Sequence, residues 1–305
     1  MVRLVQTKGV AMLPSKTPKY PNPTMKLLIE RASCRSFTKK KVPFKVAQLI
    51  LEAGIHAPTG GNLQPYSIIR IESPKLKQKL AEMCGQDFIA QAPLNLLFCI
   101  DWHRLERWAQ FEVAPFTATS SFRHFWISFE DTIISAQNIC TAADSLGLGS
   151  VYIGTILECF RDIRRILELP AGVLPVVLLC LGYPKGKLHP RKKLGVDIIV
   201  HRDKYRGYGA DKLKKAFNEK YSNLKIEITQ ERLKRISEVC KRVHGDSFAR
   251  RCLDRIRRRG YINAVQRYFG LHYAADLMPA DNEEFLNILK EFGFNWFKKF
   301  KMIER

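Results

Sequence analysis

The segment from Val173 to Gly182 constrains the fold of this chain more than any other. Apart from Pro175 and Cys180, it is a run of valine and leucine that ends at a glycine. Neighbouring side chains of a strand point to opposite sides, so a strand that is apolar at consecutive positions is buried on both faces. We therefore expect this segment to be an interior strand of a sheet that is covered on both sides.

Two further strands and several helices are expected around it. The other strand candidates are Tyr66 to Ile71 and the apolar segment Leu94 to Ile100. Helical spacing of apolar residues predicts helices over residues 25–31, from 46 to near 57, and over 75–83, 129–146 and 159–167, with several more over 210–300. Helices that alternate with few strands indicate an α+β fold, with a central mixed or antiparallel sheet flanked by helices.

The chain divides into three expected parts. Residues 1–24 are interrupted by lysine and proline and form a mostly irregular arm, residues 25–208 form the main domain, and residues 209–305 form a basic helical extension. Residues 101–128 are aromatic and basic and carry no clear periodicity. We consider two interpretations of that stretch equally: a lid over a substrate, or a helical pair at a subunit interface.

The cysteines and the hydropathy pattern suggest a cytoplasmic protein. No apolar run reaches the roughly 20 residues that a membrane-spanning helix needs, and the N-terminus lacks the apolar core of a secretory signal. None of the eight cysteines forms a C-x-x-C pair, and several lie in apolar segments. Free thiols in a reducing compartment are therefore expected, rather than disulfides or a metal site.

Basic residues exceed acidic residues along the whole chain. The sequence holds 51 Lys and Arg against 29 Asp and Glu, a formal charge of +22. The densest stretch, Arg232 to Arg259, has 11 basic and 3 acidic residues. A field of this sign attracts nucleotide phosphates, carboxylates, nucleic acid or an anionic membrane surface.

Two arginine motifs could bind an anion. Arg31, Ser33 and Arg35 place two guanidinium groups and a hydroxyl within five residues at the end of an expected helix. Arg191 follows Pro190 in a second basic motif. Because a guanidinium group has forked donors and keeps its charge, such a cluster suits a phosphate group.

Two glycine-containing segments could contact a flat ligand. In Ala57 to Tyr66, the glycines allow close approach of the backbone, and Asn62 and Gln64 offer the donors and acceptors that the edge of a heteroaromatic ring needs. The segment Gly147 to Thr155 is not a G-x-G-x-x-G motif after a strand, which argues against a dinucleotide-binding fold. Taken singly, each of the four motifs also suits a solvent-exposed turn.

The order of these motifs resembles that of the nitroreductase superfamily. The resemblance rests on Ser33-x-Arg35-x-Phe37, the run from Ala57 to Pro65, Gly85-Gln86 ahead of Ala92-Pro93, and Gly147-Leu148-Gly149 through Ile153-Gly154. From Asp131 through Tyr205 the chain is most similar to the oxygen-insensitive, NADPH-preferring nitroreductases and flavin reductases. The resemblance implies a nitroreductase-like fold and an FMN-binding domain over residues 25–208.

The resemblance also implies which residues bind FMN. The phosphate and ribityl chain would be held by Arg31, Ser33, Arg35 and Arg191. The pyrimidine edge of the flavin would meet Arg35 and Gln86. The ring would be lined by Tyr152, Ile153, Gly154 and Thr155. The protein would be a homodimer with FMN sites shared between subunits, and the other subunit would contribute Pro58, Thr59, Gly60 and Asn62.

The activity implied by the resemblance is that of an FMN-dependent NAD(P)H oxidoreductase. It would reduce nitroaromatics, quinones or flavins in two steps, with NAD(P)H as co-substrate and a small-molecule electron acceptor. Because the flavin carries the chemistry, no catalytic side chain is expected. The basic charge balance favours NADPH over NADH.

Two other functional hypotheses stay open. One is a different flavin-dependent reaction of the superfamily, such as reductive dehalogenation or a biosynthetic oxidation. The other is a nucleic-acid or anionic-partner site at Arg232 to Arg259. No recognised nucleic-acid motif accompanies that charge, so the favoured interpretation is a solvated helix face, or an arm that wraps the partner subunit and reaches the nicotinamide nucleotide.

Overall fold

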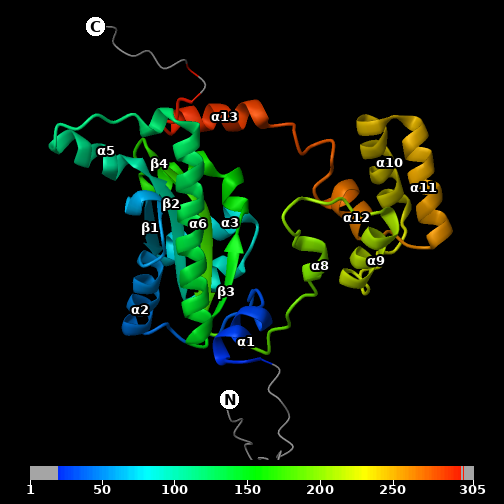
Figure 1. Cartoon of the computed structure of the whole chain (residues 1–305), viewed down its shortest axis with the longest axis horizontal. Helices are drawn as coiled ribbons and strands as arrows, with labels where there is room; N and C mark the ends of the chain where they lie inside the picture. The colour runs from blue at the N-terminus through cyan, green and yellow to red at the C-terminus, as the bar shows by residue number, and fades with distance from the viewer. Residues whose placement is uncertain (1–19, 297, 299–305) are drawn as a thin grey trace, which may run out of the picture.

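The computed structural model describes residues 20–296 and 298, and its centre is an antiparallel sheet. The strand order is β1–β2–β4–β3 (Figure 1). The strands span Tyr66–Ile71 (β1), Leu94–Asp101 (β2), Gly149–Ile153 (β3) and Val173–Gly182 (β4). The three strands expected from the sequence are confirmed, and each pairs antiparallel with its neighbours.

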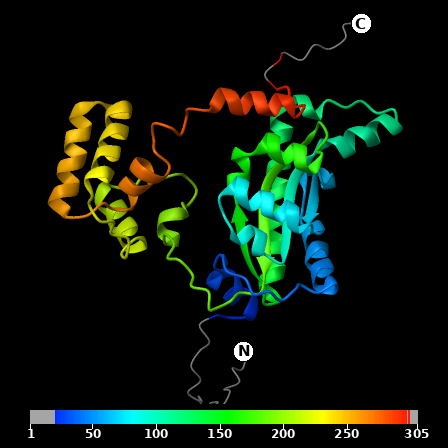
Figure 2. The ribbon, with the colours of Figure 1, turned by 180° about the vertical axis from the view of Figure 1, so that it is seen from behind.

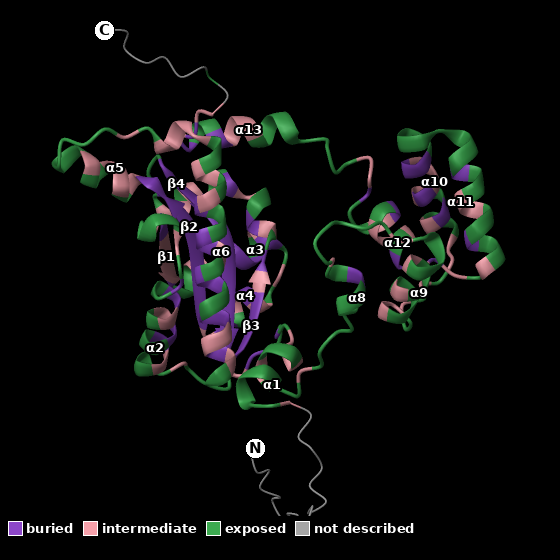
Figure 3. Ribbon diagram, viewed as in Figure 1, coloured by how far each residue is buried: buried purple, intermediate pink, exposed green. Residues whose placement is uncertain are grey.

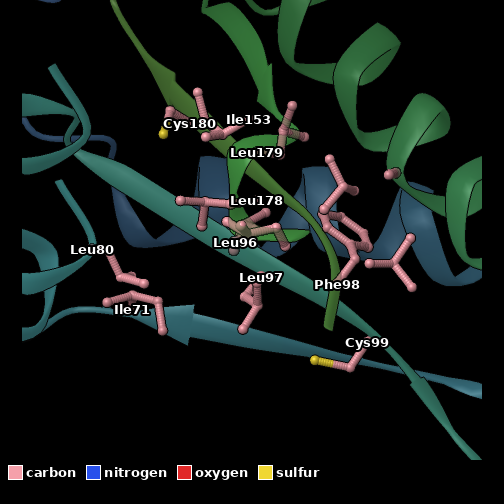
Figure 4. Close-up of a cluster of buried hydrophobic side chains, with 14 of the residues drawn as sticks. Ile71, Leu80, Leu96, Leu97, Phe98, Cys99, Ile153, Leu178, Leu179 and Cys180 are labelled. Atoms are coloured by element: carbon pink, nitrogen blue, oxygen red, sulfur yellow. The ribbon is translucent and has the colours of Figure 1, made fainter. Parts of the chain in front are cut away.

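The two middle strands, β2 and β4, are buried along their whole length. Leu97 and Phe98 project to opposite sides of β2 and reach apolar neighbours on both (Figure 4). Pro175 interrupts β4 without breaking it, because the register shifts between Phe98 and Cys99 at the point opposite this proline. Proline has no N–H to donate to the ladder, and a bulge tolerates the absence of that hydrogen bond.

Helices cover both faces of the sheet. The long helix α6 (Phe122–Ser145) crosses one face, and α2 (Phe44–Ile55) packs beside it. On the other face lie α3 (Pro74–Cys84) and α4 (Phe88–Gln91), drawn in cyan in front of the sheet in Figure 2. The expected α+β class is therefore confirmed.

The stretch 101–128 is largely helical. It contains α5 (Trp102–Phe111), a 3-10 turn at Ala118–Ser120 and the first turns of α6. The expected helix start at Phe129 is wrong, because α6 begins at Phe122.

Contacts with the far end of the chain hold the first turns of α6. The Ser121 hydroxyl caps the helix by accepting the His124 N–H at 3.3 Å. The Phe125 ring packs 4.4 Å from that of Trp296, centroid to centroid. The spacing of apolar residues around Phe122 does not show this contact with Trp296, so the sequence pattern predicts a later helix start.

Beyond β4 the chain forms a second, smaller core. The elements there are α8 (Val196–Ile199), α9 (Ala210–Lys220), α10 (Gln230–His244), α11 (Asp246–Arg259) and α12 (Ala264–Arg267), which continues as a π-helical turn at Tyr268–His272. Within this helical module, α10 and α11 pack around Leu233, Ile236, Ala249, Ile256 and Ile262. It lies to one side of the sheet in Figures 1 and 2.

The chain then returns to the sheet domain. Helix α13 (Asn282–Glu291) leads to Phe292 and Phe294, both fully buried in the main core. The Gly172 N–H donates to the Phe292 carbonyl at 2.7 Å. The described residues from 209 onward are therefore mostly helical, and Phe292 and Phe294 belong to the core of the sheet domain.

The remaining elements lie at the two ends of the sheet domain. Helix α1 (Pro23–Glu30) packs near the end of α6, and α7 (Phe160–Leu167) packs against β4. Most of the expected N-terminal arm, residues 1–19, lies outside the described residues. Within the described part of the chain, no helix has the length and hydropathy to cross a membrane.

Candidate cofactor site

The segment after α1 lies along the outer edge of β3. Ser33 forms a parallel bridge with Ser150, and the Cys34 N–H donates to the Ser150 carbonyl at 2.9 Å. Gly149 makes this approach possible, because a Cβ atom there would lie 2.6 Å from the Cβ of Cys34. The arginine motif and the start of β3 are thus fixed side by side.

Arg31 is half-buried between β3 and α6. Its Nη2 donates to the Ser150 hydroxyl at 3.1 Å and its Nε to the Cys140 thiol at 3.1 Å. The Nε also lies 3.5 Å from Oδ2 of Asp144. No sequence motif points to Ser150, Cys140 and Asp144 as partners of Arg31. The available signal is that Cys140 and Asp144 lie four residues apart and so share one face of a helix.

Asp144 titrates close to neutral pH. Burial raises its pKa from an ordinary 3.8 to about 6, while the nearby Arg31 guanidinium partly opposes that shift. Because the folded-state pKa is raised, ionisation of Asp144 destabilises the fold as the pH rises through that value. Arg31 therefore has an ionised partner only above about pH 6.

The end of β3 meets the loop that follows α3. The Gln86 side-chain amide donates to the Thr155 hydroxyl at 3.0 Å, which joins two residues that are 69 positions apart. Tyr152 donates its hydroxyl to Gln137 at 3.3 Å. Apart from its two chain neighbours, no described residue has an atom within 4 Å of the point where a Cβ would stand on Gly154. The backbone at Gly154 is therefore open to a flat ligand.

The remaining cations of the predicted site point to solvent. Arg35 and Arg191 are exposed, and neither makes a hydrogen bond or ion pair with another residue of the described chain. A shallow hollow of about 360 Å³ beside Arg31 is also lined by Pro184 and Leu188, in the segment that leads to Arg191. Both basic motifs thus border the same edge of the domain.

The loop between α2 and β1 is held at a different point of α6. The Gly60 N–H donates to both carboxylate oxygens of Asp131, at 3.0 and 3.1 Å. Burial raises the pKa of Asp131, and the Gly60 N–H opposes that shift. Gly61 and Asn62 adopt left-handed backbone angles, with φ of 60° and 56°. Glycine and asparagine tolerate this conformation best, which accounts for these residue types in the turn.

The two halves of the predicted site are apart within one chain. Asp131 and Cys140 are nine positions apart on α6, which corresponds to about 13 Å along a helix. Helix α2 and strand β3 lie on opposite sides of α6 in Figures 1 and 2. The structure therefore places Arg31 and Ser33 beside the start of β3, and Gln86 beside Thr155 just past its end, while the loop from Pro58 to Asn62 lies at a different point of α6.

Neither metal ligands nor disulfides shape this region. Across residues 20–296 and 298, no group of three or more His, Cys, Asp and Glu side chains is arranged to hold a metal ion. All eight cysteines are free thiols. Burial raises the pKa of the Cys34 and Cys140 thiols, which makes them poor nucleophiles.

Comparison with known proteins gives a consistent result. The nitroreductase family model matches residues 28–183, just over half of the chain. The oxygen-insensitive NADPH nitroreductase of Salmonella typhimurium is 33% identical over 61% of this chain and 75% of its own length.

Solved structures extend the match. The NADPH:FMN oxidoreductase from Vibrio harveyi, solved with NAD+, has a TM-score of 0.61 and 29% identity, and covers 65% of this chain and 84% of its own. NfrA2 of B. megaterium has a TM-score of 0.68 and 25% identity, and covers 91% of this chain and 100% of its own. The predicted nitroreductase-like fold is confirmed, and the chain belongs to the nitroreductase family.

Proposed function

We propose that this protein is an FMN-dependent NAD(P)H oxidoreductase that reduces nitroaromatics, quinones or flavins. The observation that carries the proposal is the edge of β3. The arginine motif adjoins the start of this strand, and the Gln86–Thr155 pair and the open backbone at Gly154 lie at its end. When bound, FMN would supply the ring that accepts a hydride and passes electrons on.

The charges of this edge fit the phosphate of FMN. Arg31 is held in place by Ser150 and α6, while Arg35 and Arg191 are exposed and without an ion-pair partner among the described residues. A dianionic phosphate would give these guanidinium groups charge-assisted hydrogen bonds. Ser33, exposed between the two arginines of the motif, would add a hydroxyl donor.

The end of β3 fits the ring of FMN. The sequence there, Tyr152 to Thr155, changes from a buried strand to an exposed backbone at Gly154. A backbone N–H from this turn would donate to the ring, and Gln86 and Arg35 would bind its pyrimidine edge. A cation at that edge stabilises the negative charge that develops when the ring accepts a hydride.

We also propose a homodimer in which each site uses both subunits. Pro58, Thr59, Gly60 and Asn62 would come from the second subunit, since α6 separates them from β3 within one chain. Leu28 and Ile29 on α1, Leu49 on α2, and Trp126 and Phe129 on α6 are large apolar residues that are exposed. All three helices carry exposed positions (Figure 3). The rings of Trp126 and Phe129 lie 6.4 Å apart, and such adjacent exposed apolar groups favour a contact with the second subunit.

The cofactor choice and the compartment follow from charge and thiol content. The formal charge of +22 supports NADPH, which carries an additional phosphate, over NADH. Eight free thiols support a reducing compartment, which we propose to be the cytoplasm.

The proposal is tested on the protein purified without added cofactor. We expect a yellow protein whose visible absorbance bleaches when NADPH is added without oxygen. The colour should return when a quinone or a nitroaromatic compound is added. A colourless protein that FMN does not reconstitute would contradict the proposed function.

A further inference from the structure

The helical module encloses a hollow of about 550 Å³ away from the sheet domain. Helices α10 and α11 and the α12 segment bound it on three sides. Its floor is formed by Ile236, Cys240 and Gly270. A Cβ atom on Gly270 would lie 2.9 Å from Cγ1 of Ile236, so glycine lets the α12 segment close the floor tightly. This size lies within the range of small-molecule sites.

The wall of the hollow is apolar and exposed. Val243, Phe248, Val265 and Phe269 line it, and between 37% and 54% of each of these residues is accessible to solvent. They come from α10, α11, α12 and the π-helical turn, so four consecutive elements converge on one apolar surface. Unburied apolar groups in a concave surface favour an apolar ligand.

Three arginines of α11 line the same hollow. Arg251, Arg255 and Arg258 are spaced four and three residues apart, which places them on one face of the helix. None of the three forms an ion pair with another residue of the described chain. The only acidic residue among the described lining residues is Asp254, and it lies 3.7 Å from Arg257, which does not line the hollow. The apolar wall therefore carries three arginines against one aspartate, a net positive charge.

We propose that this hollow binds a small anionic amphiphile, an aliphatic chain that ends in a carboxylate. The chain would cover the exposed apolar wall, and the carboxylate would accept hydrogen bonds from the guanidinium groups of α11. A solvated basic face would not require the apolar wall, and nucleic acid would use the arginines but leave that wall uncovered. The proposal is independent of the flavin site, because it uses only residues of the helical module.

The test uses the full chain saturated with FMN, so that the probe does not enter the flavin site. A fluorescent carboxylate, dansylaminoundecanoate, is titrated into the protein, and dodecanoate or dodecanol is then added as competitor. We expect saturable binding at one site per chain and displacement by dodecanoate. Dodecanol should displace the probe at least about tenfold more weakly, since it lacks the charge that the arginines would bind.

Three variants separate the contributions. Arg255→Gln removes an exposed charge of the row and should weaken binding about tenfold. Val265→Trp fills the exposed mouth of the hollow and should abolish binding. Arg257→Gln removes a charge from the same helix, outside the hollow, and should change affinity less than about twofold. Far-UV circular dichroism and flavin content check that each variant is folded.

Several results would overturn the proposal. Absence of saturable binding would do so, as would equal displacement by dodecanol and dodecanoate. If Arg257→Gln and Arg255→Gln weakened binding of the probe equally, the arginines would act by general charge attraction and not as parts of a site. Displacement of the probe by a short duplex DNA, with Val265→Trp having no effect, would instead assign the arginine row to nucleic acid.

Discussion

Replacing Phe294 by alanine is expected to destabilise the protein by about 3–5 kcal/mol. The side chain is fully buried in the core of the sheet domain, and its ring packs 5.5 Å from that of Phe125 at the start of α6. Removing it leaves a cavity between the end of the chain and the central helix. Urea unfolding followed by circular dichroism measures the change.

A matched variant in the same region is Phe285→Ala on α13. Phe285 contacts the ring of Phe160 but is 39% exposed, so its loss should cost less than half as much. If both substitutions lowered the free energy of unfolding by equally small amounts, the segment after α13 that contains Phe294 would not be part of the core. The flavin content of both variants at low urea should stay at the level of the unchanged protein.

Replacing Arg35 by alanine is expected to raise the dissociation constant for FMN at least about tenfold, the effect of losing one charge-assisted hydrogen bond. Arg35 is exposed and without an ion-pair partner in the described chain, so its loss should leave the fold unchanged. Arg191→Ala should act in the same direction. The quenching of FMN fluorescence on titration with the apoprotein measures the affinity.

Lys39→Ala is the control for Arg35→Ala. Lys39 is also exposed and lies four residues along the same segment, but it is not among the proposed site residues. Its loss should change the dissociation constant less than about twofold. If Arg35→Ala and Arg191→Ala both purify with a full complement of flavin, the assignment of the phosphate site is wrong.

Local pattern was sufficient for the sheet. The apolar runs at Leu94–Asp101 and Val173–Gly182 became the buried middle strands, and Tyr66–Ile71, with its β-branched residues, became a half-buried edge strand. The order of the strands and their antiparallel pairing required the structure, since pairing joins segments that are far apart in sequence.

The features missed by the sequence analysis depend on long-range contacts. The early start of α6 depends on Phe125 meeting Trp296, and the burial of Phe294 depends on the chain returning after the helical module. No periodicity within a short window shows either contact. The match to NfrA2 over 91% of this chain is consistent with this return, because it extends well beyond the main domain expected from the sequence.

The candidate site was predicted through motif order rather than through geometry. Gln86 and Thr155 were named separately and lie 3.0 Å apart in the structure. The partners of Arg31 were missed, because a serine on a strand and an aspartate on a helix carry no motif of their own. Their role is visible only when the segment after α1 is placed against β3.

A mixed dimer, with a different variant in each subunit, tests most directly whether one flavin site is built from two subunits. Arg35→Ala alters the β3 side of the site, and Gly60→Val alters the loop side, where a Cβ atom would lie 2.9 Å from Ile127. Each homodimer should hold little flavin. A dimer with one copy of each variant, isolated through two different affinity tags, contains one intact site and should hold about half the flavin of the unchanged protein. If the mixed dimer holds no more flavin than its parent variants, the site is not shared between subunits.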